Sequence, residues 1–107
     1  MTAEECIKGR RSIRKFTAEP VSHELLARIV ETASFAPSWK NTQITRYIAV
    51  EGAKKDALAK CTSIFPGNGV IIENAPMVIA VTAITGRSGY ERDGSFSTPK
   101  GTGWQMY

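Results

Sequence analysis

The residues best suited to bind a charged ligand lie near the start of the chain, over residues 10–16. Four cationic side chains and one hydroxyl fall within this short stretch: Arg10, Arg11, Arg14, Lys15 and Ser12. Guanidinium groups and hydroxyls are donors that proteins use to hold a phosphate. In an extended backbone Ser12 and Arg14 point to one side and Ile13 to the other. The spacing predicts a phosphate-binding loop, with a solvated basic face as the alternative.

A second polar stretch, over residues 36–43, supports the phosphate-binding interpretation. Its sequence is Ala-Pro-Ser-Trp-Lys-Asn-Thr-Gln. We expect residues 37–45 to form a loop, because the residue before Pro37 avoids the α-helical region and so ends the preceding helix. The two amides, Asn41 and Gln43, offer both donors and acceptors to a ligand.

Length, composition and charge limit the classes of protein to which the chain can belong. Its 107 residues are enough for one domain, and 42% hydrophobic residues exclude intrinsic disorder by composition. The net charge of +4 is concentrated in the basic stretch, which argues against an extended nucleic-acid-binding face. No apolar run approaches the roughly 18 residues that a membrane span needs. We therefore expect neither a nucleic-acid partner nor a membrane.

The cysteine and histidine content favours a reducing compartment and gives no metal site. Cys6 and Cys61 are far apart in the sequence, and His23 is the single histidine. These residues cannot assemble a zinc set, and the sparse cysteine usage fits a cytoplasmic protein. His23 lies in the first turn of a predicted helix, where we expect an exposed residue in preference to a catalytic one.

Two helices are predicted on either side of the basic stretch. Thr2 and a glutamate three residues later have the spacing of a capping box, so a helix should start there and end near Gly9. Within it, Cys6 and Ile7 are expected to face the core. The second helix should start after Ser22 as its N-cap. Its apolar residues recur every three or four positions: Leu25, Leu26, Ile29, Val30 and Ala33.

Two short strands and the segment between them complete the predicted core. Residues 47–50 read as a buried strand, and residues 77–81 are the strongest strand of the chain. A helix that begins at Gly52 should place its apolar residues on one side: Ala53, Ala57, Leu58 and Cys61. Its charged residues should form a solvated face: Lys54, Lys55, Asp56 and Lys60. Residues 66–69 are typical of a turn, and a helical turn is predicted after it from Ile71, Ile72 and Ala75.

The C-terminal part of the chain has a different character. Residues 85–103 are predicted to be a loop-rich segment, which is long for a compact domain. Large apolar residues follow and read as the start of another helix: Trp104, Met106 and Tyr107. The predicted elements indicate an α+β fold in a single domain over residues 1–107. Two strands make a poor sheet by themselves, so we expect a domain that is partial or is completed by another chain.

The basic stretch, the helix after it and the polar stretch together resemble the nitroreductase family of flavoproteins. The resemblance covers residues 1–85, which are similar to the N-terminal half of such a protein. It rests on the patterns Arg-x-Ser-x-Arg-x-Phe and Pro-Ser-x-x-Asn-x-Gln and on the distance between them. It implies a mixed sheet flanked by helices and a homodimer with FMN at the subunit interface. It also implies electron transfer from NAD(P)H through the flavin to a nitroaromatic, a quinone or a similar small-molecule acceptor.

The resemblance also assigns roles to particular residues. Arg10 and Ser12 would hold the FMN phosphate with Arg11 beside them, and Arg14 would approach the N1/C2-carbonyl side of the ring. Five residues would reach the flavin from the partner subunit: Pro37, Ser38, Trp39, Asn41 and Gln43. Asn68 falls where the family often places an amide on the pyrimidine edge. Because the flavin carries the redox chemistry, no catalytic side chain and no metal ligand are expected.

Three features depart from the family pattern. Ile44 follows Gln43 where proline is common, and Trp39 replaces a small polar residue. The resemblance includes none of the C-terminal half, which in the family supplies dimer helices and further flavin contacts. Two alternatives therefore stand beside the flavoenzyme. One is an inactive or flavin-free fragment of such a protein, and the other is a polyanion-binding module with Phe16, Trp39 and Tyr47 available for stacking.

Overall fold

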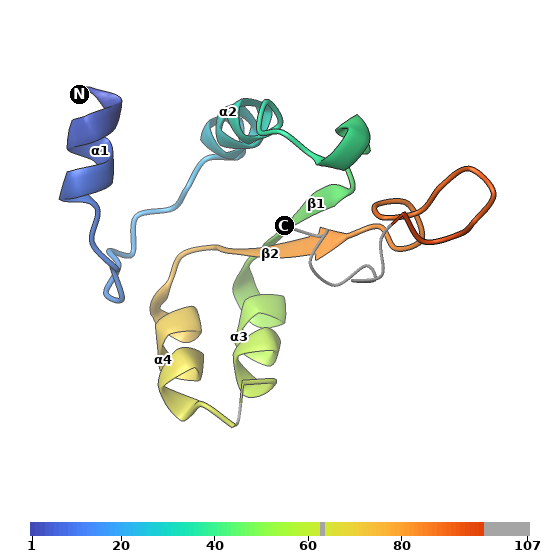
Figure 1. Cartoon of the computed structure of the whole chain (residues 1–107). Helices are drawn as coiled ribbons and strands as arrows, with labels where there is room; N and C mark the ends of the chain where they lie inside the picture. The colour runs from blue at the N-terminus through green and yellow to red at the C-terminus, as the bar shows by residue number, and fades with distance from the viewer. Residues whose placement is uncertain (63, 98–107) are drawn as a thin grey trace.

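The computed structural model describes residues 1–62 and 64–97, in which short helices lie at the two ends of a small sheet and the N-terminal helix is set apart from it (Figure 1). The elements follow one another as α1 (Ala3–Gly9), α2 (His23–Ala33), the 3-10 turn η1 (Trp39–Asn41), β1 (Thr45–Val50), α3 (Gly52–Lys60), α4 (Pro66–Asn74) and β2 (Val78–Ala83). This mixture of helices and strands confirms the predicted α+β class.

The sheet of the described chain is one antiparallel pair, in which β1 and β2 are joined through the two helices α3 and α4. Thr45 pairs with Ala83 at one end, and Val50 pairs with Val78 at the other. Both predicted strands are therefore confirmed. The polar stretch enters β1 at the Thr45 end, whereas α3 and α4 adjoin the Val50 end (Figure 1). The sheet thus separates the polar stretch from the helix pair.

Both helices beside the basic stretch begin where the capping signals predict. At α1 the Thr2 hydroxyl accepts from the Glu5 amide at 3.2 Å, and the Glu5 carboxylate accepts from the Thr2 amide at 2.7 Å. This reciprocal pair is a complete capping box. At α2 the Ser22 hydroxyl accepts from the Leu25 amide at 3.1 Å. Local hydrogen bonding between near neighbours therefore sets both N-termini.

The start of α4 corrects the sequence prediction. Residues 66–69 were expected to form a turn, but they are the first turn of this helix, with Pro66 at its N-terminal position. Proline fits there because its fixed φ suits the helix, and the amide that it lacks would have no intrahelical partner. Of the residues predicted to form a helical turn, Ile71 and Ile72 lie in the second half of the same helix, and Ala75 is its C-cap with an extended backbone.

Lys55 is the second correction, because it does not lie on a solvated face. Its side chain is only 8% exposed. The ammonium donates to the carbonyl oxygens of Ile72 at 3.2 Å and Glu73 at 2.5 Å, in the last turn of α4. The Ile72 carbonyl also accepts from the amide of the C-cap residue Ala75 at 3.2 Å, so Lys55 supplies a further donor and caps the C-terminus of α4 from α3. The buried face of α3 is therefore formed by Lys55 and Ala59, while three residues predicted for it are exposed: Ala53, Ala57 and Cys61.

Two further predictions of burial are wrong. Cys6 and Ile7 were expected to face a core, yet α1 has no buried residue and Ile7 is 75% exposed. Residues 47–50 were expected to form a buried strand, but most of β1 is exposed and Ile48 is 51% exposed. In both cases the hydrophobic residues are present, but within the described chain no other element packs closely enough to bury them.

The chain is open rather than closely packed. Its accessible surface is 8786 Å², whereas a folded monomer of 11.7 kDa is expected to expose about 5,900 Å². Its radius of gyration is 17.1 Å, compared with about 13 Å for a compact domain of this length. Among the described residues the buried apolar side chains are Ile44, Ala59 and Ala75. The fold therefore presents far more surface than a self-contained domain of its size.

After β2 the chain forms a series of turns, within the segment predicted to be loop-rich. Tyr90 and Phe96 form an isolated antiparallel bridge, and their ring centroids are 5.0 Å apart. The Ser97 amide donates to the Gly89 carbonyl at 2.8 Å, which closes a small hairpin over residues 89–97. The helix predicted to start near Trp104 lies outside the described residues. None of the helices in the described chain has the length and hydrophobicity of a membrane span.

Candidate functional site

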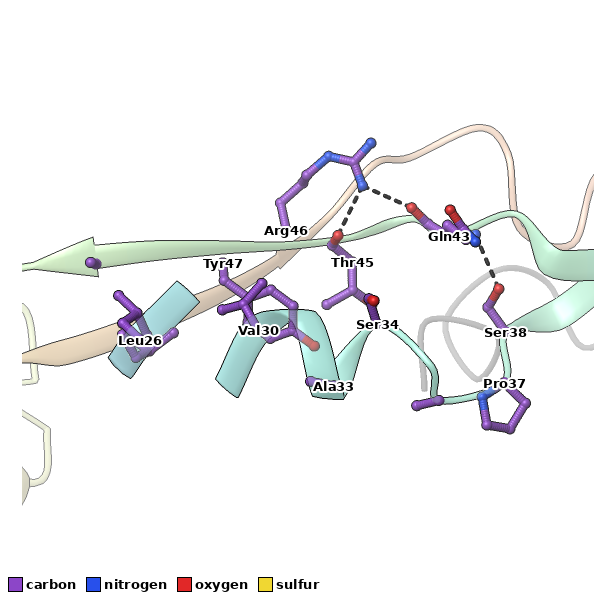
Figure 2. Close-up of a pocket in the computed structure, with 13 residues that line it drawn as sticks. Leu26, Val30, Ala33, Ser34, Pro37, Ser38, Gln43, Thr45, Arg46 and Tyr47 are labelled. Carbon is purple, nitrogen blue, oxygen red and sulfur yellow. Dashed lines mark hydrogen bonds between the residues drawn. The ribbon is translucent and has the colours of Figure 1, made fainter. Parts of the chain in front are cut away.

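A cavity of about 480 Å³ lies between α2 and the sheet. Leu26, Val30 and Ala33 line it from α2, on one side of the predicted apolar stripe (Figure 2). Tyr47 lies opposite, on β1. The remaining apolar residues of the stripe, Leu25 and Ile29, are 46% and 53% exposed. Only one side of the stripe therefore faces the sheet. The cavity between α2 and the sheet has the size of an ordinary ligand pocket.

The polar stretch closes one end of this cavity. Pro37, Ser38 and Gln43, three of the predicted site residues, are among its lining (Figure 2). The Ser38 hydroxyl accepts from the Gln43 amide at 3.0 Å, so the stretch folds back on itself. The Gln43 side-chain amide donates to Asn41 Oδ1 at 3.1 Å. All five residues predicted for this stretch, Trp39 included, thus lie in a single loop, and hydrogen bonds join three of them.

The backbone of this loop is strained. Lys40, Asn41 and Gln43 have φ values of 46°, 54° and 49°, in the left-handed region that residues other than glycine rarely adopt. Such conformations cost on the order of 1 kcal/mol each and persist only where the surroundings hold them. Asparagine tolerates this region well, so Asn41 alone was a sequence signal for it.

Arg46 and Glu91, neither of which belongs to a sequence motif, hold the strained loop in place. The Arg46 guanidinium donates to the carbonyl oxygens of Gln43 and Thr45, both at 2.8 Å. The Lys40 ammonium contacts the two carboxylate oxygens of Glu91 at 3.0 and 3.1 Å, and it lies 4.6 Å from the centroid of the Trp39 ring. Because Lys40 and Glu91 are 51 residues apart, no local pattern could have predicted their contact.

The environment of Glu91 favours its ionised form. Its carboxylate accepts from the Ser97 hydroxyl at 2.7 Å as well as from Lys40. The hydrogen bond from Ser97 is the largest cause that lowers the pKa of Glu91, and the hydrogen bond and charge of Lys40 lower it further. The contact between Lys40 and Glu91 is therefore an ion pair at neutral pH.

The basic stretch lies apart from this loop. All four predicted residues are exposed, and none of them lines the cavity beside α2: Arg10, Arg11, Ser12 and Arg14. Figure 1 shows the connection between α1 and α2 on the opposite side of α2 from η1. The guanidinium of Arg11 donates to the carbonyl oxygens of Lys8 at 3.1 Å and Arg10 at 2.9 Å. Within one chain the two predicted parts of the site are not brought together.

The side chains of the basic stretch are nevertheless suited to an anion. Among the described residues, the side chains of Arg10, Ser12, Arg14 and Lys15 have no hydrogen-bond or ion-pair partner. Their donors are therefore available to a phosphate, and no described carboxylate neutralises them. Unpartnered guanidinium groups at this density are costly through mutual repulsion unless an anion or the solvent screens them.

Two other residues noted in the sequence lie far from the loop. Asn68 is exposed in the first turn of α4, beyond the opposite end of the sheet (Figure 1). His23 is the first residue of α2, with a side chain 78% exposed, and its Nε2 lies 2.9 Å from the Glu51 carboxylate. The expectation of an exposed histidine is thus confirmed. Over residues 1–62 and 64–97, no group of three His, Cys, Asp or Glu side chains could hold a metal ion.

The described chain thus carries an exposed basic stretch and, apart from it, an amide-bearing loop that closes one end of an apolar cavity. The family model described as "Nitroreductase family" matches residues 7–66, more than half of the chain and both of these loops. The chain therefore belongs to the nitroreductase family, as the sequence patterns predicted.

Individual relatives agree with this membership. Nitroreductase NfnB from Mycolicibacterium smegmatis is 43% identical over 58 residues, which are 54% of this chain and 25% of that protein. The 4-nitrobenzoate reductase of Pseudomonas putida is 36% identical over 53 residues, which are 50% of this chain and 23% of that protein. Spy0809 from Streptococcus pyogenes, provisionally named an NAD(P)H nitroreductase, is 36% identical over 76% of this chain and 39% of its own length.

Solved structures confirm the fold. A nitroreductase family protein from Clostridium novyi NT superposes with a TM-score of 0.70 at 30% identity, over 100% of this chain and 55% of that one. A protein from Desulfovibrio desulfuricans, solved in complex with FMN, superposes with a TM-score of 0.64 at 26% identity, over 88% of this chain and 49% of that one. The chain thus spans about half the length of these structures and less of the curated relatives.

Proposed function

We propose that this chain serves an FMN-dependent oxidoreductase, in which the flavin accepts electrons from NAD(P)H and passes them to a nitroaromatic, a quinone or a similar small acceptor. The observation that carries the proposal is the family match over residues 7–66, since it includes both the basic stretch and the polar loop. The FMN complex of the Desulfovibrio protein and the provisional NAD(P)H assignment of Spy0809 support the choice of cofactor and electron donor.

The residues present fit this cofactor. In the proposed site Arg10 and Ser12 hold the phosphate with Arg11 beside them, and Arg14 approaches the N1/C2-carbonyl side of the ring. The hydrogen bond between Asn41 and Gln43 leaves the Asn41 amide nitrogen as a donor and the Gln43 amide oxygen as an acceptor. That pair complements the alternating donors and acceptors of a flavin pyrimidine edge.

Other residues contribute in different ways to the proposed site. Pro37 and Ser38 shape the end of the cavity, and in the proposed dimer Trp39 reaches the flavin from the partner subunit. A positive charge from Arg14 favours the reduced cofactor, which is anionic near N1. The proposed role of Asn68 on the pyrimidine edge requires a contact that the position of α4 within this chain does not provide, so we assign it to a contact between chains.

The same geometry supports a homodimer as part of this proposal. The basic stretch and the polar loop lie on opposite sides of α2 in one chain (Figure 1), so one flavin can meet both only if a second subunit supplies one of them. The surface in excess of a compact monomer is about 2,900 Å². Two such chains together carry about 5,800 Å² of excess surface, and stable homodimer interfaces bury about 2,000–5,000 Å² in total, so a dimer contact could cover much of it. We further propose that residues 1–107 belong to one domain and that the protein works in the cytoplasm, where its two free cysteines stay reduced.

The test compares FMN binding by two variants. Arg10→Ala removes an unpartnered guanidinium of the basic stretch, whereas Lys54→Ala removes an exposed lysine of α3 that has no partner among the described residues. Loss of one charged hydrogen bond costs about 1.5–3 kcal/mol, which is about a 10- to 150-fold rise in Kd. We expect that rise for Arg10→Ala alone, measured by flavin fluorescence. Equal affinities for FMN in the two variants would remove the phosphate assignment.

A further inference from the structure

A second hollow, of about 630 Å³, lies where the polar loop meets the hairpin that follows β2. Trp39 and Lys40 line it from the loop, and Arg87, Tyr90 and Arg92 line it from the turns. No sequence motif includes the three residues of the turns. Two aromatic rings and three cations thus surround one space.

The positive charge of this hollow comes from two arginines. Glu91 and Asp93 also line it, so the five charged groups sum to one net positive charge. Both carboxylates already accept strong hydrogen bonds. Glu91 pairs with Lys40, and Asp93 accepts from the amide and the hydroxyl of Ser95 at 2.9 and 2.6 Å.

Arg87 and Arg92 take no part in these interactions. Among the described residues, neither side chain has a hydrogen-bond or ion-pair partner. A guanidinium without a protein partner retains its full set of donors for a carboxylate or phosphate ligand, which it can bind through two parallel hydrogen bonds.

The hairpin fixes where these arginines lie. The Tyr90 amide donates to the Arg87 carbonyl at 3.3 Å, and the bridge between Tyr90 and Phe96 holds the next turn. Along the chain, Arg87 precedes Tyr90 and Arg92 follows it. The ion pair between Lys40 and Glu91 ties this hairpin to the polar loop and so places Trp39 at the same hollow.

We propose that this hollow binds a ligand that joins a planar aromatic ring to an anionic group. The rings of Trp39 and Tyr90 contact the aromatic part, and Arg87 and Arg92 hold the anion. Two ligand sources share this chemistry: the adenosine phosphate end of the reduced dinucleotide, and an aromatic carboxylate that acts as electron acceptor. That either ligand takes part in the redox reaction rests on the proposed function, whereas its binding to the hollow does not.

The experiment measures binding to the flavin-free 107-residue chain by calorimetry, so that a failure of FMN binding cannot affect the result. The probes are AMP, benzoate and inorganic phosphate. The test variant is Arg87→Gln with Arg92→Gln, and the matched control is Lys54→Gln. Both arginines are exposed, and circular dichroism of each variant checks that the fold is kept.

We expect AMP or benzoate to bind, and the double arginine variant to bind it at least about tenfold more weakly than the chain itself and the Lys54→Gln control. Binding of AMP alone identifies the dinucleotide as the source, and binding of benzoate alone identifies the acceptor. Three results would overturn the proposal: no binding of either probe at millimolar concentration, equal affinity in the double variant, or phosphate binding as tight as that of the aromatic anions.

Discussion

Lys55 provides a quantitative test of the packing that joins α3 to α4. Its ammonium donates to two carbonyl oxygens at the end of α4 and lies 3.3 Å from Asp56 Oδ1. The change Lys55→Met keeps the length of the side chain and removes all of these interactions. Its matched control is Lys54→Met, one position earlier on the same helix, where the side chain is exposed and has no partner among the described residues.

The expected cost follows from the hydrogen bonds that Lys55→Met removes. A hydrogen bond from a charged donor is worth about 1.5–3 kcal/mol, but the two carbonyls share one donor group. Methionine also avoids the desolvation of a buried ammonium, and water can reach the exposed end of α4. We therefore expect Lys55→Met to lower the free energy of unfolding by about 1.5–3 kcal/mol in total. The control should change it by less than about 0.5 kcal/mol.

Urea unfolding followed by circular dichroism measures both variants. The midpoint should fall for Lys55→Met while the slope stays constant, because the surface exposed on unfolding does not change. Hydrogen exchange supplies a local readout, since the amides of α4 should lose protection before those of the sheet. If the two methionine variants unfold at the same urea concentration, Lys55 does not cap α4 and the burial described for it is wrong.

Two further predictions concern the polar loop and the subunits. The pKa of Glu91, followed by NMR of its carboxyl carbon, should lie below the ordinary 4.5 and should rise in Ser97→Ala and in Lys40→Met. Because the pKa of Glu91 is lowered in the folded state, its ion pair with Lys40 stabilises the loop above the ordinary pKa and is lost as the pH falls through the lowered value. An unshifted titration of Glu91 would contradict this ion pair. For the subunits, sedimentation of the flavin-bound protein should show a dimer, and a compact monomer that holds FMN alone would contradict the shared site.

The sequence predicted those features that depend on near neighbours. The N-caps at Thr2 and Ser22 and both strands follow from patterns within a few residues, and the structure contains them. The start of α4 at Pro66 was missed because a Pro-Gly-Asn-Gly sequence has the composition of a turn, although proline also suits the first position of a helix.

Features that depend on distant contacts were not predictable in the same way. Helical periodicity places Lys55 among charged neighbours, but its acceptors lie 17 and 18 residues further along the chain. The partner of Lys40 is Glu91, beyond both strands. The apolar residues of α1 and β1 were assigned to a core by composition, whereas burial also requires a covering element. In each case the missing information is the position of another segment.

The same distinction applies to the candidate site. The sequence patterns identified the basic stretch and the polar loop, and the family match includes both. Three left-handed residues and the hydrogen bonds of Arg46 give the loop its shape, and of these features only the left-handed conformation of Asn41 had a sequence signal. Arg87 and Arg92 lie in turns that contain no sequence motif. Two structural observations identify them: both line the second hollow, and neither side chain has a partner among the described residues.

The most direct test of the central claim compares FMN with riboflavin, which lacks the phosphate. If Arg10 and Ser12 hold the phosphate, at least two hydrogen bonds distinguish the ligands, and at least about 3 kcal/mol separates their affinities. We therefore predict that FMN binds about 100-fold or more tightly than riboflavin, and that Arg10→Ala reduces this ratio by about tenfold or more. Equal affinity for the two flavins, or no binding of either, would contradict the proposed cofactor site.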